Sequence, residues 1–372
     1  MERTMIVTML AVGLMALVCT AAMGDGPAAG PKHNLVTFFN KCRAGGDVTV
    51  AYIGGSITAQ EGWRPFTTKW LGEQFKGLKV HEVNAAIGGT GSWLGVYRLY
   101  KDVLAHDPDL LFVEFAVNDN GAPDDDVKAT MEGIVRQAWS RPKKPDIMFT
   151  YTTAGNLEVP TKRHQAVADA YGIPTCDFQA SIRALCVPGL VDWDIMAADR
   201  VHPGDWGHAV YAATLATHLR QQIKLTEAAP PPDVLPPATF SDEYTSARLM
   251  PVVAGLPEGW QKLDKSWPFD DGSIMATKPG STIEFKFNGT SVAMYYELRV
   301  DGGFVQAEVD GKVVGEYDVS AGATFPWNRP NGLQIARGLA KGPHTLRLTV
   351  MDKKTDLSKG YEFHLGYLML TG

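Results

Sequence analysis

A serine and a distant histidine have the residue types and neighbours that nucleophilic catalysis requires. Ser56 ends an apolar run at a Gly-Gly-Ser turn, and His202 follows Asp199 by three residues in the stretch Asp-Arg-Val-His-Pro. A serine hydroxyl is a weak nucleophile until a base removes its proton. A histidine can be that base, and an aspartate can fix its tautomer and stabilise the imidazolium. These three side chains therefore predict a Ser-His-Asp triad that attacks an ester carbonyl.

Attack on a carbonyl creates an oxyanion, which needs preorganised hydrogen-bond donors. Gly89, in a Gly-Gly pair, and Asn118, in an Asn-Asp pair, each follow an apolar segment between the serine and the histidine. The backbone N–H groups of Ser56 and Gly89 and the side-chain amide of Asn118 are the expected donors. Glycine suits this position because the backbone must approach the substrate closely or adopt a positive φ.

Each of these residues also has a purely structural interpretation. The Gly-Gly-Ser segment could be a strand-to-helix turn, the Asn-Asp pair an Asx turn, the Gly-Gly pair a flexible loop, and Asp199 a helix cap. The four signals occur together in the order that one chemistry needs, which favours the catalytic interpretation. His208 lies further into the last helical segment, where a structural hydrogen bond is favoured over catalysis.

The elements that must position these residues alternate between strand-like and helix-like segments from residue 47 to 224. Amphipathic stretches such as Leu94–Leu104, Asp125–Trp139 and Pro160–Tyr171 separate short apolar segments. This pattern predicts an α/β fold, a three-layer parallel sheet of right-handed βαβ units. Such sheets bind ligands beyond the carboxyl ends of their strands, where the strand-end residues would converge. The expected strands are Val48–Ile53, Val80–Asn84, Leu110–Phe115, Ile147–Tyr151 and Ile173–Phe178.

Length and composition indicate an exported protein of two domains. The chain has 372 residues, 45% of them hydrophobic, with a net charge of −6. The sequence has no basic patch of the kind that would indicate nucleic acid as a partner. One Arg, a long apolar run and small residues predict a signal peptide at residues 1–24. No second long apolar segment follows, so we expect a secreted or periplasmic chain without a membrane span. Its catalytic domain is expected at residues 32–226 and a proline-rich linker at residues 227–240.

Residues 241–372 change to the alternating pattern of an all-β sandwich or jelly roll. Asp310-Gly311 separates two alternating runs and is a strong hairpin signal. Residues 325–330 are expected to form a loop between strands, and Trp260, Trp267 and Trp327 are the candidate sugar-stacking residues of this module. Of three cysteines after the signal peptide, Cys176 and Cys186 are near enough in sequence to bridge, but a buried strand position is favoured for Cys176. We expect no cofactor, and no residues have zinc-ligand spacing.

Residues 47–224 resemble the SGNH hydrolases, also called GDSL-type esterases. Gly-Gly-Ser56, Asn-Ala-Ala-Ile-Gly-Gly89, Ala-Val-Asn118-Asp and Asp199-Arg-Val-His202-Pro match the four sequence blocks of that family in order. The resemblance implies a flavodoxin-like sheet and makes Ser56, Gly89, Asn118 and His202 the four name residues. Two positions depart from the common pattern: Gly55 stands where many members have Asp, and Ala116 where many have Gly.

Neither the fold nor the triad identifies the substrate. The signal peptide, the appended β-module and tryptophans at positions 63, 93 and 193 favour carbohydrate esters, because sugar rings could stack on Trp63, Trp93 and Trp193. For any one of these tryptophans, packing in the core is the favoured alternative. We therefore expect removal of acetyl or other short acyl groups from a poly- or oligosaccharide. A glycan-binding protein on a non-catalytic scaffold and a sugar O-acyltransferase are the alternatives.

Overall fold

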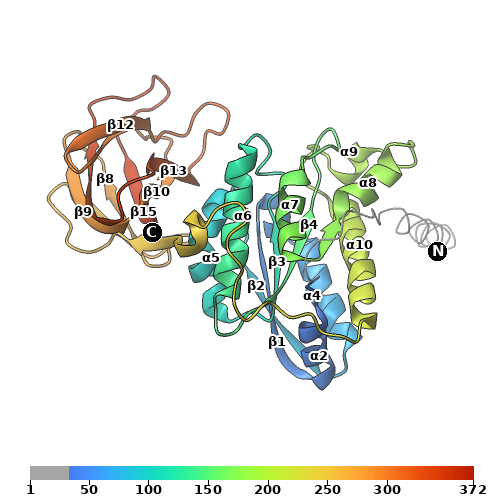
Figure 1. The fold of residues 1–372 in the computed structure, drawn as a ribbon. Helices are drawn as coiled ribbons and strands as arrows, with labels where there is room; N and C mark the ends of the chain where they lie inside the picture. Colours follow the sequence, from blue (N-terminus) through green and yellow to red (C-terminus); the bar gives the residue numbers. More distant parts are fainter. Residues whose placement is uncertain (1–32) are drawn as a thin grey trace. The chain divides into compact units, whose positions relative to one another are not determined.

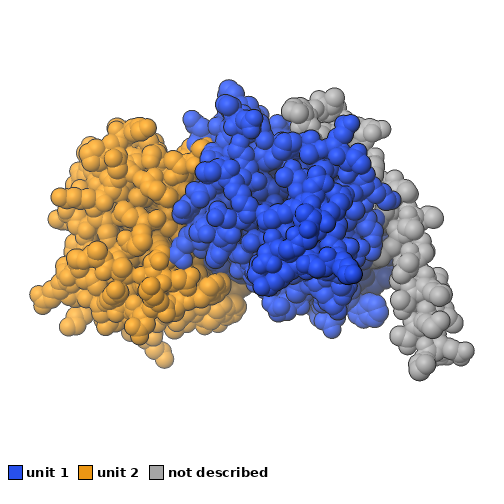
Figure 2. All heavy atoms as spheres, turned by 90° about the horizontal axis from the view of Figure 1, so that it is seen from below, with its two compact units in different colours: residues 1–95, 99–242 blue, residues 96–98, 243–372 orange. Residues whose placement is uncertain are grey.

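The computed structural model describes residues 33–372, so the expected signal peptide lies outside the described residues. The chain forms two compact units, which divide between Asp242 and Glu243, with Val96–Arg98 grouped with the second unit. Figure 2 shows the two units in different colours. In the described part of the chain, none of the helices combines the length and the apolar character needed to cross a membrane.

The first unit is built on a parallel sheet with the strand order β2-β1-β3-β4-β5 (Figure 1). Its central strands are buried along their whole length, as a sheet covered on both faces requires. The expected parallel α/β fold is therefore confirmed. The strands are β1 (Gly46–Gly54), β2 (Leu78–Asn84), β3 (Leu110–Glu114), β4 (Asp146–Tyr151) and β5 (Thr175–Asp177).

Helices cover both faces of this sheet, with α5 and α6 on one side and α4 and α10 on the other (Figure 1). Alternate strand residues such as Val50 and Tyr52 pack with α2, α4, α8 and α10 in one apolar cluster. The helices are α2 (Val36–Ala44), α3 (Ser56–Ala59), α4 (Trp63–Gln74), α5 (Ser92–Asp102), η1 (Leu104–His106), α6 (Asp124–Trp139), α7 (Lys162–Tyr171), α8 (Phe178–Cys186), α9 (Trp193–Met196) and α10 (Asp205–Lys224).

Two expected elements begin or end elsewhere. The sequence predicts an amphipathic helical stretch from Pro160 to Tyr171, but α7 begins after the N-cap residue Thr161, so the proline precedes the helix. The fifth strand spans Thr175–Asp177 and is shorter than expected at both ends. Its carboxyl end is set by Asp177, which caps α8 by accepting a hydrogen bond from the Ala180 N–H. A polar capping side chain thus ends the strand within an apolar stretch.

The second unit is a sandwich of two antiparallel sheets, as the alternating pattern predicts. One sheet has the order β13-β10-β15-β8-β7, with β6 paired to β15, and the other has the order β12-β11-β14-β9. Asp310 and Gly311 both have positive φ, as a type I′ hairpin turn needs. The strands are β6 (Arg248–Pro251), β7 (Trp260–Leu263), β8 (Ser273–Ala276), β9 (Thr282–Gly289), β10 (Ser291–Leu298), β11 (Phe304–Val309), β12 (Lys312–Asp318), β13 (Arg329–Ala336), β14 (Gly342–Val350) and β15 (Phe363–Thr371), after a short helix η2 (Glu243–Ser246).

The sandwich core decides which of its tryptophans face solvent. Trp260 is buried and packs edge-on against Phe363, so its expected role in sugar stacking is wrong. Trp267 and Trp327 are more than half exposed. Residues 325–330 are only partly a loop, since β13 starts at Arg329.

Candidate active site

Ser56 lies at the carboxyl end of β1, where the sheet passes directly into a short helix. Gly54 ends the strand, Gly55 is the N-cap of α3 and Ser56 is its first residue. The N–H of a first helical residue has no intrahelical acceptor, so it is available to an incoming anion. The turn therefore presents both a hydroxyl and a backbone donor at one point of the sheet edge.

Asp199 and His202 lie in a loop between α9 and α10 that is held in an unusual backbone conformation. Arg200 has a φ of +64°, which is costly for a residue with a side chain. Its carbonyl oxygen accepts hydrogen bonds from the Gly155 N–H and the Trp193 indole N–H, at 2.6 and 3.1 Å. Its guanidinium donates to Asp194 and to the Gly155 carbonyl oxygen. These contacts compensate the strain and fix the loop.

The structure brings the three predicted triad residues into one chain of hydrogen bonds. Ser56 Oγ lies 2.7 Å from His202 Nε2, and His202 Nδ1 lies 2.7 Å from Asp199 Oδ2. A carboxylate can only accept, so the imidazole proton faces Asp199 and Nε2 is left to accept the serine proton. The geometry is that of a nucleophile, a base and the group that orients the base.

Asp199 is held in its charged form by its own loop. The backbone N–H of His202, the His202 side chain and the Val201 N–H all donate to its carboxylate, and they lower its pKa to about 2. The other Asp199 oxygen, Oδ1, receives the two backbone donors, which leaves Oδ2 for the imidazole. Both side chains face solvent, with 37% of His202 and 57% of Asp199 exposed.

Gly89 lies in a tight turn that the first two strands place beside the serine. Ala85 and Ile87 continue the hydrogen bonding to β1 after β2 has ended. The Thr90 N–H donates to the Ile87 carbonyl oxygen, with Gly89 at the third position of the turn and a φ of +72°. That conformation favours glycine in a type II turn. A methyl group on Gly88 would lie 3.6 Å from Ser56 Cβ, so this turn borders the serine.

Asn118 follows β3 and lies against the same serine turn. A methyl group on Gly55 would lie 3.2 Å from Asn118 Nδ2 and only 2.6 Å from Asn118 Cγ. The Asn118 side chain is partly exposed, whereas Asp119 beside it is buried. Residues from three strand ends are therefore brought together, as the strand order predicts for an open parallel sheet.

Asp119 ties the second and third strand ends to each other. Its carboxylate accepts a hydrogen bond from the Ser92 N–H at the start of α5, at 2.8 Å, and contacts His164 Nε2 at 2.9 Å. The Asn-Asp pair thus places one side chain at the serine turn and uses the other as a helix cap. The structural interpretation of this Asn-Asp pair from the sequence was an Asx turn, and the sequence indicated no partner for Asp119.

Glu114 is a second buried carboxyl group that the sequence did not indicate. It ends β3 and accepts hydrogen bonds from the hydroxyls of Thr152 and Thr58, at 2.7 and 2.9 Å, and from the Gly55 N–H. Burial raises its pKa to about 7, although these hydrogen bonds oppose the shift. Glu114 therefore holds the serine turn from inside the protein.

His208 has the structural role that the sequence favoured. Its ring packs against Gly62, and Nδ1 accepts a hydrogen bond from the Trp63 N–H at 3.2 Å. Burial lowers its pKa to about 4, so it is neutral in ordinary conditions.

Two of the tryptophans expected to bind sugar are buried, which corrects that prediction. Trp63 is 0% exposed and packs edge-on against Tyr52 and Phe178. Trp193 is 4% exposed, and its indole N–H supports the loop that carries Asp199 and His202. A ring enclosed on both faces cannot stack on a sugar. Trp93 is partly exposed in the first turn of α5, and its role stays a prediction.

The described cysteine and acidic side chains form neither a disulfide nor a metal site. Cys176 is buried on β5, as favoured, and no disulfide joins Cys42, Cys176 and Cys186. Within residues 33–372, no three His, Cys, Asp or Glu side chains are grouped so that they could hold a metal ion.

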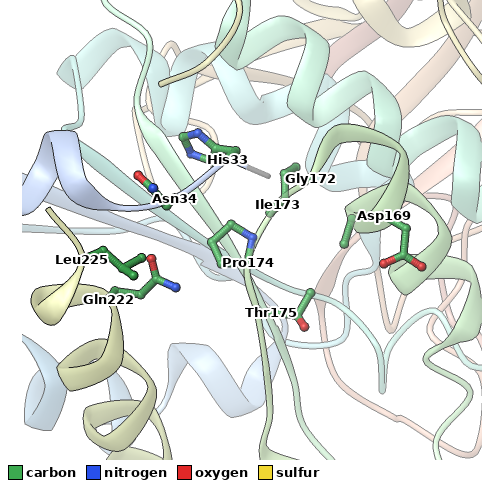
Figure 3. Close-up of a pocket in the computed structure, with 10 residues that line it drawn as sticks. His33, Asn34, Asp169, Gly172, Ile173, Pro174, Thr175, Gln222 and Leu225 are labelled. Atoms are coloured by element: carbon green, nitrogen blue, oxygen red, sulfur yellow. The ribbon is translucent and has the colours of Figure 1, made fainter. Parts of the chain in front are cut away.

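A cavity of about 370 Å³ lies away from the triad (Figure 3). Three of its lining residues, Ile173, Pro174 and Thr175, lie just before β5 and at its first position, so the cavity is at the amino end of that strand. The triad residues instead follow the carboxyl ends of strands. None of the predicted site residues contributes to it. It is lined by His33, Asn34, Ala168, Asp169, Gly172, Ile173, Pro174, Thr175, Gln222 and Leu225.

Comparisons with known proteins agree with this architecture. Residues 52–210 match the GDSL-like Lipase/Acylhydrolase family. Two solved structures of a two-domain esterase (CEX) active on acetylated mannans are similar to the chain. One, with a TM-score of 0.79 and 22% identity, covers 93% of this chain and 98% of its own. The other, co-crystallised with mannopentaose, has a TM-score of 0.78 and 21% identity, with 93% and 97% covered. Comparison with curated proteins found no match.

Proposed function

We propose that this chain, whose residues 52–210 match the GDSL-like Lipase/Acylhydrolase family, is a serine esterase that removes acetyl or other short acyl groups from a carbohydrate. The observation that carries the proposal is the continuous hydrogen-bonded chain from Asp199 through His202 to Ser56, with both contacts at 2.7 Å. A protein that only binds a glycan has no chemical need for this arrangement.

The reaction follows from the positions of the protons. Ser56 Oγ attacks the ester carbonyl while His202 Nε2 takes the hydroxyl proton, and the charged Asp199 stabilises the imidazolium. The N–H groups of Ser56 and Gly89 and the Asn118 amide bind the oxyanion. Collapse of this intermediate breaks the bond to the sugar oxygen, which leaves with the proton from His202. Water, deprotonated by His202, then attacks the acyl carbon. The bond between that carbon and Ser56 Oγ breaks, Oγ takes the proton back from His202, and the carboxylic acid is released.

The choice of a carbohydrate ester is supported by three observations. The sequence predicts a signal peptide, so the chain would act in the secreted or periplasmic space where polysaccharides occur. The structures of the two-domain esterase active on acetylated mannans share the fold of both units. The exposed His202 and Asp199 side chains leave the first unit open enough for a bulky substrate.

The test is acyl release by purified chain, with Ser56→Ala as the inactive variant. We expect wild-type protein to hydrolyse an aryl acetate and to release acetate from acetylated mannan or xylan, and a serine-directed phosphonate to label Ser56. Ser140→Ala, on an exposed serine at the end of α6, is the matched control and should keep full activity. Labelling at another serine, or full turnover by Ser56→Ala, would falsify the assignment. Acyl transfer to an added sugar in place of acetate release would favour the transferase alternative.

A further inference from the structure

One buried carboxylate joins the two segments that supply the proposed oxyanion donors Gly89 and Asn118. Gly89 lies in the turn before α5, and Asn118 follows β3. Asp119, next to Asn118, accepts a hydrogen bond from the Ser92 N–H at the start of α5, at 2.8 Å. The N-cap residue of α5 is Gly91, which has no side chain to accept that bond, so Asp119 supplies the acceptor from another strand end.

Two consecutive residues in the first turn of α7 hold Asp119 in turn. His164 Nε2 lies 2.9 Å from Asp119 Oδ2, and the Arg163 guanidinium donates to the Asp119 carbonyl oxygen at 2.7 Å. The side chains of His164 and Asp119 are only 1% and 4% exposed. Water therefore cannot readily replace this hydrogen bond, and its loss would leave a buried carboxylate with one partner fewer.

The hydrogen bond between His164 and Asp119 can run in one direction only. A carboxylate accepts and does not donate, so the imidazole proton is on Nε2. Nδ1 is buried and has no hydrogen-bond partner within residues 33–372. A shift of the proton to Nδ1 would leave a buried donor unpaired, which costs stability. His164 thus serves Asp119 as a fixed donor.

Asn118 depends on this arrangement because its own side chain has no anchor. The Asn118 carboxamide makes no hydrogen bond to any other residue between 33 and 372. Its place is set by a backbone that continues directly into Asp119. Gly89 lies three residues before Ser92, whose N–H binds the same carboxylate. A shift of Asp119 would therefore disturb both proposed donors.

We propose that His164 is a positioning residue, which holds the Asn118 and Gly89 donors in place through its hydrogen bond to Asp119. This inference rests on the proposed function, since it needs a reaction with a developing oxyanion. Misplacement of a reacting group by about 1 Å can cost on the order of 100-fold in rate. Oxyanion donors act on the transition state, so the loss should appear in kcat more than in KM.

The first test compares two substitutions of His164 on a soluble aryl acetate. His164→Phe keeps a ring but removes the donor, and it should lower kcat on the order of 10- to 100-fold with KM nearly unchanged. His164→Gln places an amide N–H close to the former Nε2 and should keep most of the wild-type kcat. Equal losses in the two variants would show that the hydrogen bond is not what matters, and would overturn the proposal.

Tyr171→Phe is the matched control on the same helix. The Tyr171 hydroxyl donates to the buried Glu132 carboxylate at 2.6 Å, so this variant also removes a buried hydrogen bond of α7. It should lower the melting temperature and leave kcat unchanged. A fall in kcat as large as that of His164→Phe would show that α7 acts only through stability, which would overturn the proposal.

A double-mutant cycle tests whether His164 acts through the oxyanion donors. Asn118→Ala should lower kcat about 100- to 1,000-fold. His164→Phe should then cost less in this background than in wild type, because one of the two donors that it positions is already gone. Losses that multiply in full would show that His164 acts elsewhere, and would overturn the proposal.

Asp119→Asn provides a test if His164→Phe does not fold. Its single amide oxygen cannot accept from both the Ser92 N–H and His164, so kcat should fall. Adding His164→Gln gives the new amide group an acceptor oxygen and should recover part of the lost rate. The absence of any recovery would overturn the proposal.

A crystal structure of His164→Phe separates this inference from the proposed function. Asn118 and Gly89 should be moved, while the contact between Ser56 and His202 is kept. Unmoved Asn118 and Gly89 would overturn the inference whether or not the chain is an esterase. An unchanged kcat in His164→Phe, in an enzyme that Ser56→Ala inactivates, would overturn the inference and leave the esterase function standing.

Discussion

The Trp193 indole N–H donates to the Arg200 carbonyl oxygen across 3.1 Å, in the loop between Asp199 and His202 of the proposed triad. This bond helps to hold Arg200 at a φ of +64° and with it the spacing of the aspartate and the histidine. Residues in such conformations persist because the surrounding structure over-determines them. In the proposed mechanism, Trp193 therefore acts through the loop that carries Asp199 and His202.

Trp193→Phe should therefore lower kcat about fivefold with KM almost unchanged, which corresponds to the ~1 kcal/mol of a typical hydrogen bond. The measurement is steady-state kinetics on an aryl acetate. Trp139→Phe is the matched control, since its buried indole N–H donates to the Pro145 carbonyl oxygen at 3.2 Å, away from the triad. It should lower stability but not kcat. Equal kinetics for both variants and wild type would show that the loop does not need the indole bond.

The pH dependence of kcat/KM should show no ionisation of Asp199 above about pH 4. His202 is the proposed base and accepts the Ser56 proton on its neutral ring. The pKa of Asp199 is lowered to about 2, and this carboxyl group therefore stays ionised from about pH 4 upward. Chelator treatment should leave activity unchanged, because the base is an imidazole. Loss of activity restored by zinc would instead indicate a metal-activated water.

Glu114 should make the folded state less stable as the pH rises from about 4.5 to about 7. Burial raises its folded pKa to about 7 from an ordinary value of 4.5, so the folded state favours the protonated carboxyl group. Stability is then greatest below the unfolded pKa and is lost as the pH rises through the folded pKa, by about 3 kcal/mol in total. Urea unfolding at both ends of this range, compared between wild type and Glu114→Gln, measures the difference. A constant difference would show that Glu114 does not titrate in this window.

A catalytic fragment should include residues up to Asp242. Glu132 is fully buried and accepts backbone hydrogen bonds from Thr239, Phe240 and Ser241, at 2.6 to 2.8 Å. A chain that ends near Pro231 loses these donors and leaves a buried carboxyl group with fewer hydrogen-bond partners, which typically costs about 1–3 kcal/mol. The fragment ending at Asp242 should unfold at a higher temperature than the shorter one and hydrolyse an aryl acetate.

Thermal unfolding of the two fragments tests this expectation, with Glu132→Ala in the longer fragment as the variant that removes the same bonds. Equal melting temperatures for all three proteins would contradict it. A lower rate on acetylated polysaccharide alone, relative to the full chain, would indicate that the second unit assists with the polymer.

The sequence by itself determined which segments are strands and helices and which residues follow the strands. The alternation of strands and helices indicates a parallel sheet, and parallel strands bring their carboxyl ends to one edge. Ser56, Gly89 and Asn118 could therefore be predicted as neighbours although they are far apart in the chain. The three-residue spacing of Asp199 and His202 made their contact a local property.

Only the tertiary structure decided which side chains are enclosed and which pairs compete for space. Tryptophan is a residue type that can stack on sugar rings. Trp63 and Trp193 are nevertheless buried, by packing against the sheet and against the loop of Asp199 and His202. Sequence periodicity does not reveal that Glu114 accepts hydrogen bonds from residues of two other segments. Nor does it reveal that Asn118 fills the space beside Gly55. Such contacts join residues distant in sequence and depend on how adjacent elements pack, which no local pattern encodes.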